Sequence, residues 1–415
     1  MWNILKIFGI IIIVAGCSIN ERPNNLISTP SNEKWLEELK GQLDKDLPQN
    51  YRLLTPKSNK EKQMIWLFDL QEKKEKEAVV IYKEPTENCK IYLSIYKQIN
   101  GLWTGVEKHH FTGDNVDILK IGDFTGDHKD EILIGISSSN KLDKSTIYAF
   151  SVKGCKLSAI YQQNYTKLFI EDFNQNGIED ISLVNYQKNR YLKVMFIEKF
   201  NTLSEISFNP NLNSIEKIQV GWISKKNKGI VIDGGFSEHS SITYVAKFIK
   251  NRFEKIFRDE ENPLVRESLV ESKDVNNDGI IDFASTFKPK GWEEKTNPER
   301  PMFERYLQLK ENNFTTIEER YINLENGYII RIPKELIGKI TLATNNKVNN
   351  IQRLLYAKTN ETWLEVYTFK PNENLDLKKF FKILKNTSRI SAIPNQQKYK
   401  KWTGCIKPLS EYQLE

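Results

Sequence analysis

Short apolar stretches separated by polar turns dominate the chain from residue 50 onward. Stretches such as STIYAFSV, YLKVMFIEKF and SITYVAKFIK are rich in β-branched and aromatic residues, which favour strands. Before them, SNEKWLEELKG (31–41) places Trp35, Leu36 and Leu39 on one face and predicts a short helix capped by Ser31 and Gly41. Residues 18–49 are therefore expected to form a polar tether and this helix, and the rest is expected to be mainly β.

A pattern of strand, polar loop and strand recurs along the chain. The three clearest copies are ILKIGDFTGDHKDEILIGI, KLFIEDFNQNGIEDISLVN and VESKDVNNDGIIDFAST, whose nine-residue loops begin at Asp123, Asp172 and Asp274. The first two lead residues are 49 apart and the last two 102 apart, about two periods. This doubled gap predicts a degenerate copy near Trp222, in VGWISKKNKGIVIDGGF, and another degenerate copy begins at Asp69, 54 residues before Asp123.

Five copies at intervals near fifty residues predict an all-β propeller. We expect about five four-stranded blades over residues 50–320, followed by a small α+β domain at 325–415. In that domain YIIRI, KITLAT, IQRLLYAK and TWLEVYTFK are expected strands. A helix is predicted around 375–385, because Leu377, Phe380, Phe381 and Leu384 fall at i, i+3, i+4 and i+7. The alternative is that the late strands complete another blade.

The nine-residue loops have the donor pattern of calcium sites. Side-chain oxygens at positions 1, 3, 5 and 9 and a carbonyl at position 7 suit an ion that takes six to eight oxygen ligands. The expected ligands are Asp274, Asn276, Asp278, Ile280 and Asp282 in the third loop; Asp172, Asn174, Asn176, Ile178 and Asp180 in the second; and Asp123, Thr125, Asp127, Lys129 and Glu131 in the first. Ile280, Ile178 and Lys129 would contribute their carbonyls.

The three loops differ in details that bear on affinity. Gly279 and Gly177 stand at position 6, where a positive φ is needed, whereas the first loop has His128 there. The second loop carries less charge than the third and is expected to bind more weakly. The copies at Asp69 and Trp222 have lysines at ligand positions and are expected to hold no ion. The alternative for all copies is an Asx-rich turn that bonds only to its own backbone.

The first seventeen residues predict an export signal. One positive charge, Lys6, precedes an apolar run from Ile7 to Val14, which is too short to span a membrane. The run ends in Val-Ala-Gly-Cys17, which resembles the lipobox of bacterial lipoproteins. This resemblance implies that Cys17 becomes a diacylglyceryl, palmitate-bearing N-terminus, which would anchor the chain to the cell membrane on its extracytoplasmic side. The alternative is an uncleaved signal with an incidental cysteine.

The loops and their flanking strands resemble the FG-GAP or VCBS repeats of integrin heads and bacterial surface proteins. With the lipobox, LLTP (53–56), IDGGFSEHS (232–240) and GYIIRIPKELIGKITL (327–342), the whole chain is similar to uncharacterised VCBS-repeat lipoproteins of low-GC Gram-positive bacteria. This resemblance implies calcium-binding propeller blades. It implies an architecture more strongly than an activity.

Composition narrows the possible partners. Charged residues make up 28% and hydrophobic residues 39% of the chain, which is typical of a folded protein. The 61 Lys and Arg against 54 Asp and Glu give a net charge of +7, spread along the sequence. No nucleic-acid-binding module accompanies these charges, so we expect no nucleic-acid partner.

Other reactive residues give weaker signals. Cys89, Cys155 and Cys405 could form one disulfide, and the sequence does not choose among the three pairings. Neighbouring His109 and His110 would point to opposite faces of a strand and lack a third metal ligand.

IDGGFSEHSS contains acid, histidine and serine without a nucleophile-elbow pattern, which makes a polar turn or groove the preferred interpretation. We therefore expect a binding or interaction lipoprotein, not an enzyme, whose ligand is a protein or a cell-wall glycan. The alternative is a propeller-based polysaccharide hydrolase or lyase, because paired carboxylates could come from a propeller's top face.

Overall fold

The computed structural model of the chain describes residues 34–58, 63–69, 77–87, 89–138, 145–237, 240–294, 301–311, 313–344, 350–373, 375–376, 378–385 and 389–410. Cys17 and the segment that carries the lipobox lie outside these ranges. Within them, no helix is both long enough and apolar enough to cross a membrane.

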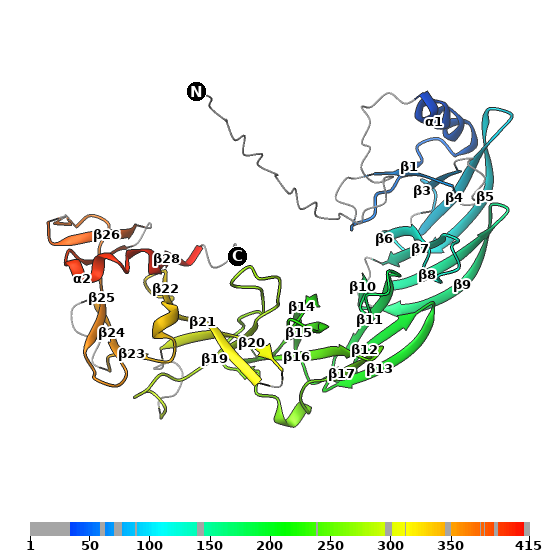
Figure 1. The fold of residues 1–415 in the computed structure, drawn as a ribbon. Helices are drawn as coiled ribbons and strands as arrows, with labels where there is room; N and C mark the ends of the chain where they lie inside the picture. The colour runs from blue at the N-terminus through cyan, green and yellow to red at the C-terminus, as the bar shows by residue number, and fades with distance from the viewer. Residues whose placement is uncertain are drawn as a thin grey trace, which may run out of the picture.

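The described residues form six antiparallel sheets that follow one another along the chain (Figure 1). In the first sheet the order is β1-β3-β4-β5, with β2 also paired to β3. Its strands are β1 (Arg52–Leu53), β2 (Ile65–Phe68), β3 (Glu77–Lys83), β4 (Lys90–Ile99) and β5 (Leu102–Thr112).

The next three sheets each have a path of four strands in sequential order, and the last of them has a fifth strand off this path. The second sheet has β6 (Asn115–Gly122), β7 (Glu131–Ser137), β8 (Ser145–Lys153) and β9 (Lys156–Tyr165). The third has β10 (Lys167–Glu171), β11 (Asp180–Gln187), β12 (Tyr191–Glu198) and β13 (Asn201–Phe208). The fourth has β14 (Ser214–Trp222), β15 (Lys228–Ser237), β16 (Ser240–Ile249) and β17 (Arg252–Lys255), and β18 (Val265–Arg266) pairs with β16.

The last two sheets share the C-terminal part of the chain. The fifth has β19 (Phe283–Thr286), β20 (Met302–Lys310), β21 (Asn313–Asn323), β22 (Tyr328–Ile332) and β28 (Ile406–Pro408), in that order. The sixth has the order β23 (Ile340–Leu342), β24 (Ile351–Tyr356), β25 (Thr362–Phe369), β27 (Ile390–Pro394) and β26 (Phe380–Lys385). Helix α2 (Gln397–Lys400) and short 3-10 turns at Asp259–Glu261, Lys334–Leu336 and Thr403–Cys405 complete the described elements.

Sheets two to five have both faces buried, because a separate apolar cluster fills each junction between successive sheets. The runs EILIGIS of β7 and DISLVNYQ of β11 are buried over most of their length, as strands covered on both faces must be. Between the second and third sheets, for example, Leu133 and Ala149 pack with Leu183 and Ile197. The core of this protein is therefore a series of inter-sheet layers and not one central cluster.

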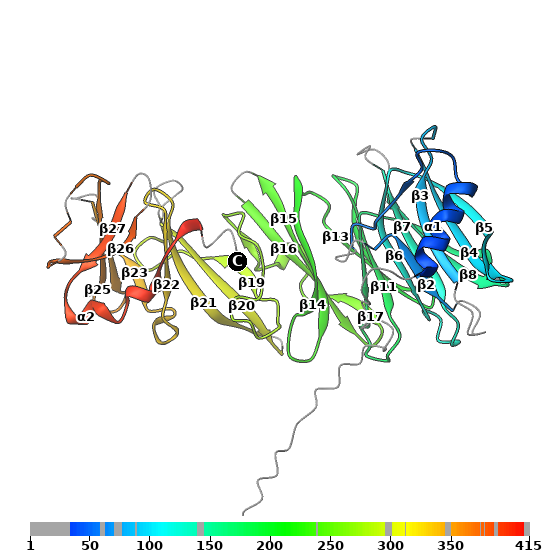
Figure 2. The ribbon, with the colours of Figure 1, turned by 90° about the horizontal axis from the view of Figure 1, so that it is seen from above.

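Helix α1 (Lys34–Asp46) covers the free face of the first sheet (Figure 2). Its Leu39 and Leu43 are fully buried against a cluster that includes Val80 and Trp103. The helix was expected to end at Gly41, but it continues to Asp46 because Leu43 extends the apolar face by another turn. No further sheet can stack on the face that α1 occupies.

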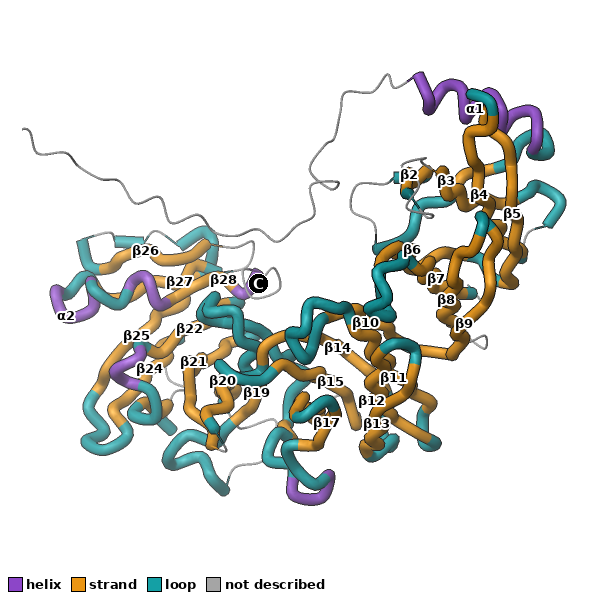
Figure 3. The backbone as a smooth tube through the Cα atoms, turned by 45° about the vertical axis from the view of Figure 1, so that its right-hand side comes forward, coloured by secondary structure: helices purple, strands orange, loops and turns teal. Residues whose placement is uncertain are grey.

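The sheets follow an open arc, with α1 at one end and β26 near the other (Figures 1 and 3). The expectation of a nearly all-β chain built from four-stranded antiparallel sheets is confirmed. The described residues do not close into the ring of a five-bladed propeller, since the capped first sheet lies far from the last. The first strands β6, β10 and β14 lie on the inner side of the arc, and β5, β9, β13 and β17 lie on its outer side (Figure 1).

The predicted α+β domain at 325–415 is wrong in two respects. First, Phe380–Lys385 is strand β26 and not part of a helix; Phe381 packs toward the core while Phe380 contacts Tyr367 on the other face. The apolar spacing that suggested a helix also suits a strand with apolar residues on both faces. Second, β22 and β28 belong to the fifth sheet, so a boundary at 325 cuts through that sheet.

Candidate metal-binding loops

The repeated loops occupy equivalent corners of successive sheets, as their spacing predicted. In each, the residue before the loop pairs with the loop's ninth residue; the loops of the second and third sheets join the first strand to the second, the loop of the first sheet joins β2 to β3, and the loop at 274–282 is closed by an isolated bridge before β19. These pairs are Phe68 with Glu77, Gly122 with Glu131, Glu171 with Asp180, and Lys273 with Asp282. The loops at 123–131, 172–180 and 274–282 are turns and not helices.

The ninth residue of each of the three acidic loops makes the same bond. One of its carboxylate oxygens accepts a hydrogen bond from the main-chain N–H of position 2. The distances are 3.0 Å from Phe124 to Glu131, 3.1 Å from Phe173 to Asp180 and 3.1 Å from Val275 to Asp282. This bond folds the end of the loop back over its beginning.

The lead aspartate holds the middle of each loop. It accepts from the N–H of position 6 at 2.9 Å in the first loop, 2.9 Å in the second and 2.8 Å in the third. The side chain at position 5 accepts from the N–H of position 7, at 3.0, 2.8 and 2.9 Å in the same order. The side chains at positions 1, 5 and 9 therefore all turn toward the loop's own main chain in the three loops.

Position 6 has a positive φ in every loop, as the glycines there predicted. The angle is +84° at Gly177, +81° at Gly279 and +66° at His128. A residue with a Cβ is strained in this region, so the first loop adopts the shared conformation at a cost of about 1 kcal/mol. The histidine does not prevent the loop from forming.

Burial makes the ninth carboxylate of each loop difficult to ionise. Asp180 and Asp282 are 1% and 0% exposed. Burial raises the pKa of Asp180 to about 7, and the nearby carboxylates of Glu198 and Asp172 add to the rise. Burial likewise raises the pKa of Asp282 to about 6, with Asp278 and Asp274 adding to it, and burial raises the pKa of Glu131. A cation among these oxygens would remove the repulsion.

Two features of these residues fit a calcium ion: the chemistry of their oxygen donors, and one buried oxygen that accepts no hydrogen bond. Oδ1 of Asp180 is buried and has no hydrogen-bond partner in the described part of the chain. Across the same residues, no Lys or Arg forms an ion pair with Glu131, Asp180 or Asp282. No group of three or more His, Cys, Asp or Glu in the described ranges is arranged to hold a metal. The candidate donor sets instead mix carboxylates with amide, hydroxyl and carbonyl oxygens, which calcium accepts.

At the two degenerate corners a lysine supplies positive charge. In the first sheet, fully buried Glu77 is the ninth residue, and Nζ of Lys97, its cross-strand partner, lies 3.8 Å from Oε1. In the fourth sheet, Trp222 pairs with Lys228, so Lys228 takes the place of the ninth residue. Its ammonium donates to the carbonyl of Asp172 at 2.8 Å and pairs with Glu171 of the third sheet.

The alignment that made Trp222 the lead residue of its copy is wrong. Trp222 precedes the turn, as Gly122 and Glu171 do, and the turn that follows is three residues shorter than in the acidic loops. A shorter turn cannot wrap around an ion, and its ninth-position equivalent is a lysine.

The loops of neighbouring sheets touch along one rim of the arc. A Cβ on Gly126 of the first loop would lie 2.7 Å from Cδ1 of Ile178 in the second. Lys120 of β6 pairs with Glu179 of the second loop. Farther along, the N–H of Ile281 donates to the carbonyl of Trp222 at 2.8 Å. An ion in one loop would therefore stabilise a junction between sheets as well as a turn.

The polar cluster around Asp233 is part of the core. Asp233 is buried and accepts from Arg266 Nη2 at 3.0 Å, from the hydroxyl of Ser272 at 3.0 Å and from the hydroxyl of Thr243. Arg266 also donates from Nε to the carbonyl of Val270 at 2.9 Å. This network joins the fourth and fifth sheets and leaves Asp233 no free edge for catalysis; His239 lies outside the described residues.

Among the residues that the structure describes, the histidines and cysteines gather into no metal-binding group. His109 contacts Phe111 and Phe150 on one face of β5, with ring centroids 4.8 and 4.9 Å away, while His110 faces Tyr92. Cys89, Cys155 and Cys405 form no disulfide within the described part of the chain, and Sγ of Cys155 lies 3.8 Å from Oε1 of Glu77. Trp103 and Trp292 are buried in the core.

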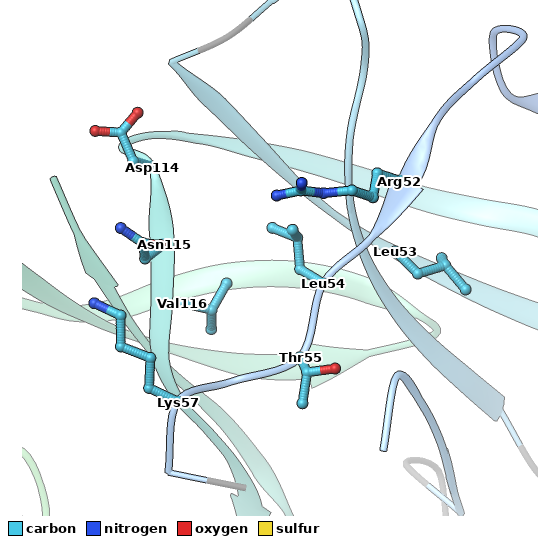
Figure 4. A pocket seen from close by; sticks show the side chains of 8 residues that line it. All are labelled: Arg52, Leu53, Leu54, Thr55, Lys57, Asp114, Asn115 and Val116. Carbon is cyan, nitrogen blue, oxygen red and sulfur yellow. The ribbon is translucent and has the colours of Figure 1, made fainter. Parts of the chain in front are cut away.

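A pocket lies at the seam between the first and second sheets (Figure 4). It is lined by the segment 52–55 and by Lys57, Asp114, Asn115 and Val116. Lys57 Nζ donates to Asp117 Oδ1 at 3.1 Å, and the Lys57 N–H donates to the carbonyl of Val116 at 2.9 Å. The pocket is therefore bounded by a segment that crosses from one sheet to the next.

Comparison with known proteins gives no family. The chain matches no protein-family model, and no curated protein matches it in sequence. Among solved structures it is similar to Bacillus licheniformis rhamnogalacturonan lyase PL11, at 11% identity over 75% of this chain and 81% of that one, with a TM-score of 0.29.

Two further structures are similar at the same level. The exotype rhamnogalacturonan lyase YesX matches at 9% identity over 77% and 74% of the two chains, with a TM-score of 0.29. The exo-β-1,3-galactanase 1,3Gal43A from Clostridium thermocellum matches at 9% identity over 80% of each chain, with a TM-score of 0.25. Similarities of this size carry no inference about activity.

Proposed function

We propose that this protein is a binding lipoprotein of the extracytoplasmic membrane face, built as an open stack of propeller-like blades with calcium in three loops. Its ligand would be a protein or a cell-wall polymer. The lipid on Cys17 would hold it to the membrane.

The observation that carries the calcium proposal is the pattern of charge at equivalent corners. Where the ninth position lacks a lysine partner, its carboxylate is buried beside further acidic groups. Where the loop is degenerate, Lys97 or Lys228 brings an ammonium to that corner. A calcium ion would supply the missing charge in the acidic loops and would act as a structural staple.

The inner side of the arc is the surface we assign to ligand binding. The first strands β6, β10 and β14 are edge strands, and nearly all their residues are half-buried. Edge strands offer unpaired main-chain groups, which can recognise an extended chain. This side also carries ion pairs such as Lys120 with Glu179 and Lys217 with Glu271. Charged groups on the surface favour a polar partner.

A binding screen tests the proposal. The purified full-length chain is mixed with cell-wall fractions and with exported proteins, with calcium or with a chelator, and the bound material is measured. We expect saturable retention by one of these classes, with weaker retention after calcium is removed because the junctions loosen. No retention by either class would contradict the proposal, and turnover of a wall polymer would favour the hydrolase or lyase alternative.

Anchoring is tested separately in cells. The C17A variant should move from the membrane fraction to the soluble extracytoplasmic fraction, because it cannot receive a lipid. An unchanged membrane association of C17A would contradict lipid anchoring without affecting the calcium proposal.

A further inference from the structure

One cross-strand position faces the end of every repeated loop. It lies on the strand that pairs with the strand after the loop, opposite the ninth loop residue in the register. Its occupants are Lys97 in the first sheet, Ser151 in the second, Glu198 in the third, Phe248 in the fourth and Gln308 in the fifth. The side chain at this position determines whether the ninth residue of the loop faces a hydrogen-bond donor, an acid or an apolar group.

In the fifth sheet this position satisfies the loop with hydrogen-bond donors. Gln308 is buried, and its Nε2 donates to Asp278 Oδ2 at 2.9 Å and to Asp282 Oδ1 at 3.2 Å. Both oxygens of Asp282 therefore have partners, since Oδ2 accepts from Val275.

In the third sheet the same position carries an acid. Glu198 has no proton to donate when ionised, and Oδ1 of Asp180, the atom equivalent to the one that Gln308 satisfies, is left without a partner. Oε1 of Glu198 instead accepts from Nδ2 of Asn174 at 2.8 Å and from Nδ2 of Asn176 at 3.3 Å. Glu198 thus reaches the side chains at positions 3 and 5 of the loop.

Two acids that face each other across a strand pair destabilise a sheet unless a cation lies between them. Asp180 is almost fully buried, so water cannot separate the two charges. A cation bound between Asp180 and Glu198 would remove this repulsion.

We infer that Glu198 is a ligand of the second loop, donated from β12 across the sheet to the ion held by Asp172 and Asp180. This inference rests on the proposed calcium function. With Glu198 included, the sequence supplies three carboxylates to each loop, and an ion would have to draw them closer together than the described arrangement does. They are Asp123, Asp127 and Glu131; Asp172, Asp180 and Glu198; and Asp274, Asp278 and Asp282. The second loop was expected to bind calcium more weakly because it carries fewer charges than the third, and Glu198 removes this difference.

Calcium titration of the full-length chain by calorimetry tests this ligand. E198Q keeps the size of the side chain and gains a donor, as in Gln308, so it should fold. We expect the affinity of one site to fall on the order of tenfold to a hundredfold, the range seen when groups that support a metal are changed. The matched control is E205Q, which removes the same charge from the same sheet at an exposed ion pair with Lys193.

A double variant locates the effect. If Glu198 and Asp172 hold the same ion, D172N and D172N/E198Q should both lack that one site and should titrate identically. If the wild-type protein binds calcium and E198Q binds it with the same affinity, Glu198 is not a ligand, and only this inference is overturned. Wild-type protein that binds no calcium would overturn the calcium proposal and this inference together.

Discussion

Replacing Asp180 by Asn should stabilise the chain without calcium and should reduce the stabilisation that calcium adds. Without calcium, the wild-type chain buries a carboxylate whose Oδ1 has no partner and which faces Glu198. Asn keeps an oxygen for the N–H of Phe173 and gains an N–H that can donate to Glu198. Relief of one unsatisfied buried group should raise the free energy of unfolding by about 1 to 3 kcal/mol.

With calcium, this gain in stability should shrink or disappear. A ligand present at a hundred times its dissociation constant stabilises the folded state by about 2.7 kcal/mol. D180N should lose most of this contribution at the second loop, since a carboxylate ligand and its charge are gone. The wild-type chain should therefore gain more from calcium than D180N does, by about 2 to 3 kcal/mol.

Thermal unfolding of both chains in calcium and in chelator measures the effect. The control is D233N, whose carboxylate is compensated by Arg266 and lies outside every loop. D233N should destabilise the protein equally in both conditions. If D180N lowers the melting temperature by the same amount with and without calcium, Asp180 is an ordinary buried polar residue and the reasoning is refuted.

Three further substitutions test other features of the charge pattern. K97M should destabilise the chain by about 3 to 5 kcal/mol in denaturant unfolding, because it removes the ammonium beside buried Glu77. The double variant E77Q/K97M should recover much of this loss. Equal stability of the single and double variants would contradict the prediction. R266M should lower the free energy of unfolding by a similar amount, about 3 to 5 kcal/mol in the same measurement, because it leaves Asp233 buried without its cationic partner. A loss below about 1 kcal/mol would show that the hydroxyls of Ser272 and Thr243 are enough to stabilise the buried carboxylate. H128G should raise stability by up to about 1 kcal/mol, since glycine adopts the +66° φ without strain, and a decrease would indicate a contact that the histidine side chain makes.

The sequence predicted the corners of the sheets because a nine-residue acidic turn is a local feature. Asp123 and Asp172 each begin a turn between two paired strands, and Asp274 begins a turn closed by the bridge from Lys273 to Asp282, so their spacing alone located equivalent points. The cross-strand residues were missed for the opposite reason. Glu198 and Gln308 approach the loops only through strand register, and no spacing in the sequence links Glu198 to Asp180.

Other differences follow from information that is not local. Trp222 was misaligned because its turn is three residues shorter, which only the pairing with Lys228 reveals. The Phe380–Lys385 segment satisfies a helical period, but it becomes a strand because β27 pairs with it and both of its faces find apolar neighbours. The open arc depends on how successive sheets stack and on the cap formed by α1, neither of which a repeat length specifies.

Diffraction from crystals of the full-length chain grown with calcium, measured for anomalous scattering, tests the central claim most directly. The account predicts three peaks, each among the side chains at positions 1, 3, 5 and 9 of the loops at 123–131, 172–180 and 274–282, and none at the corner closed by Lys228. Loops without a peak at saturating calcium, or an ion at the Lys228 corner, would contradict it.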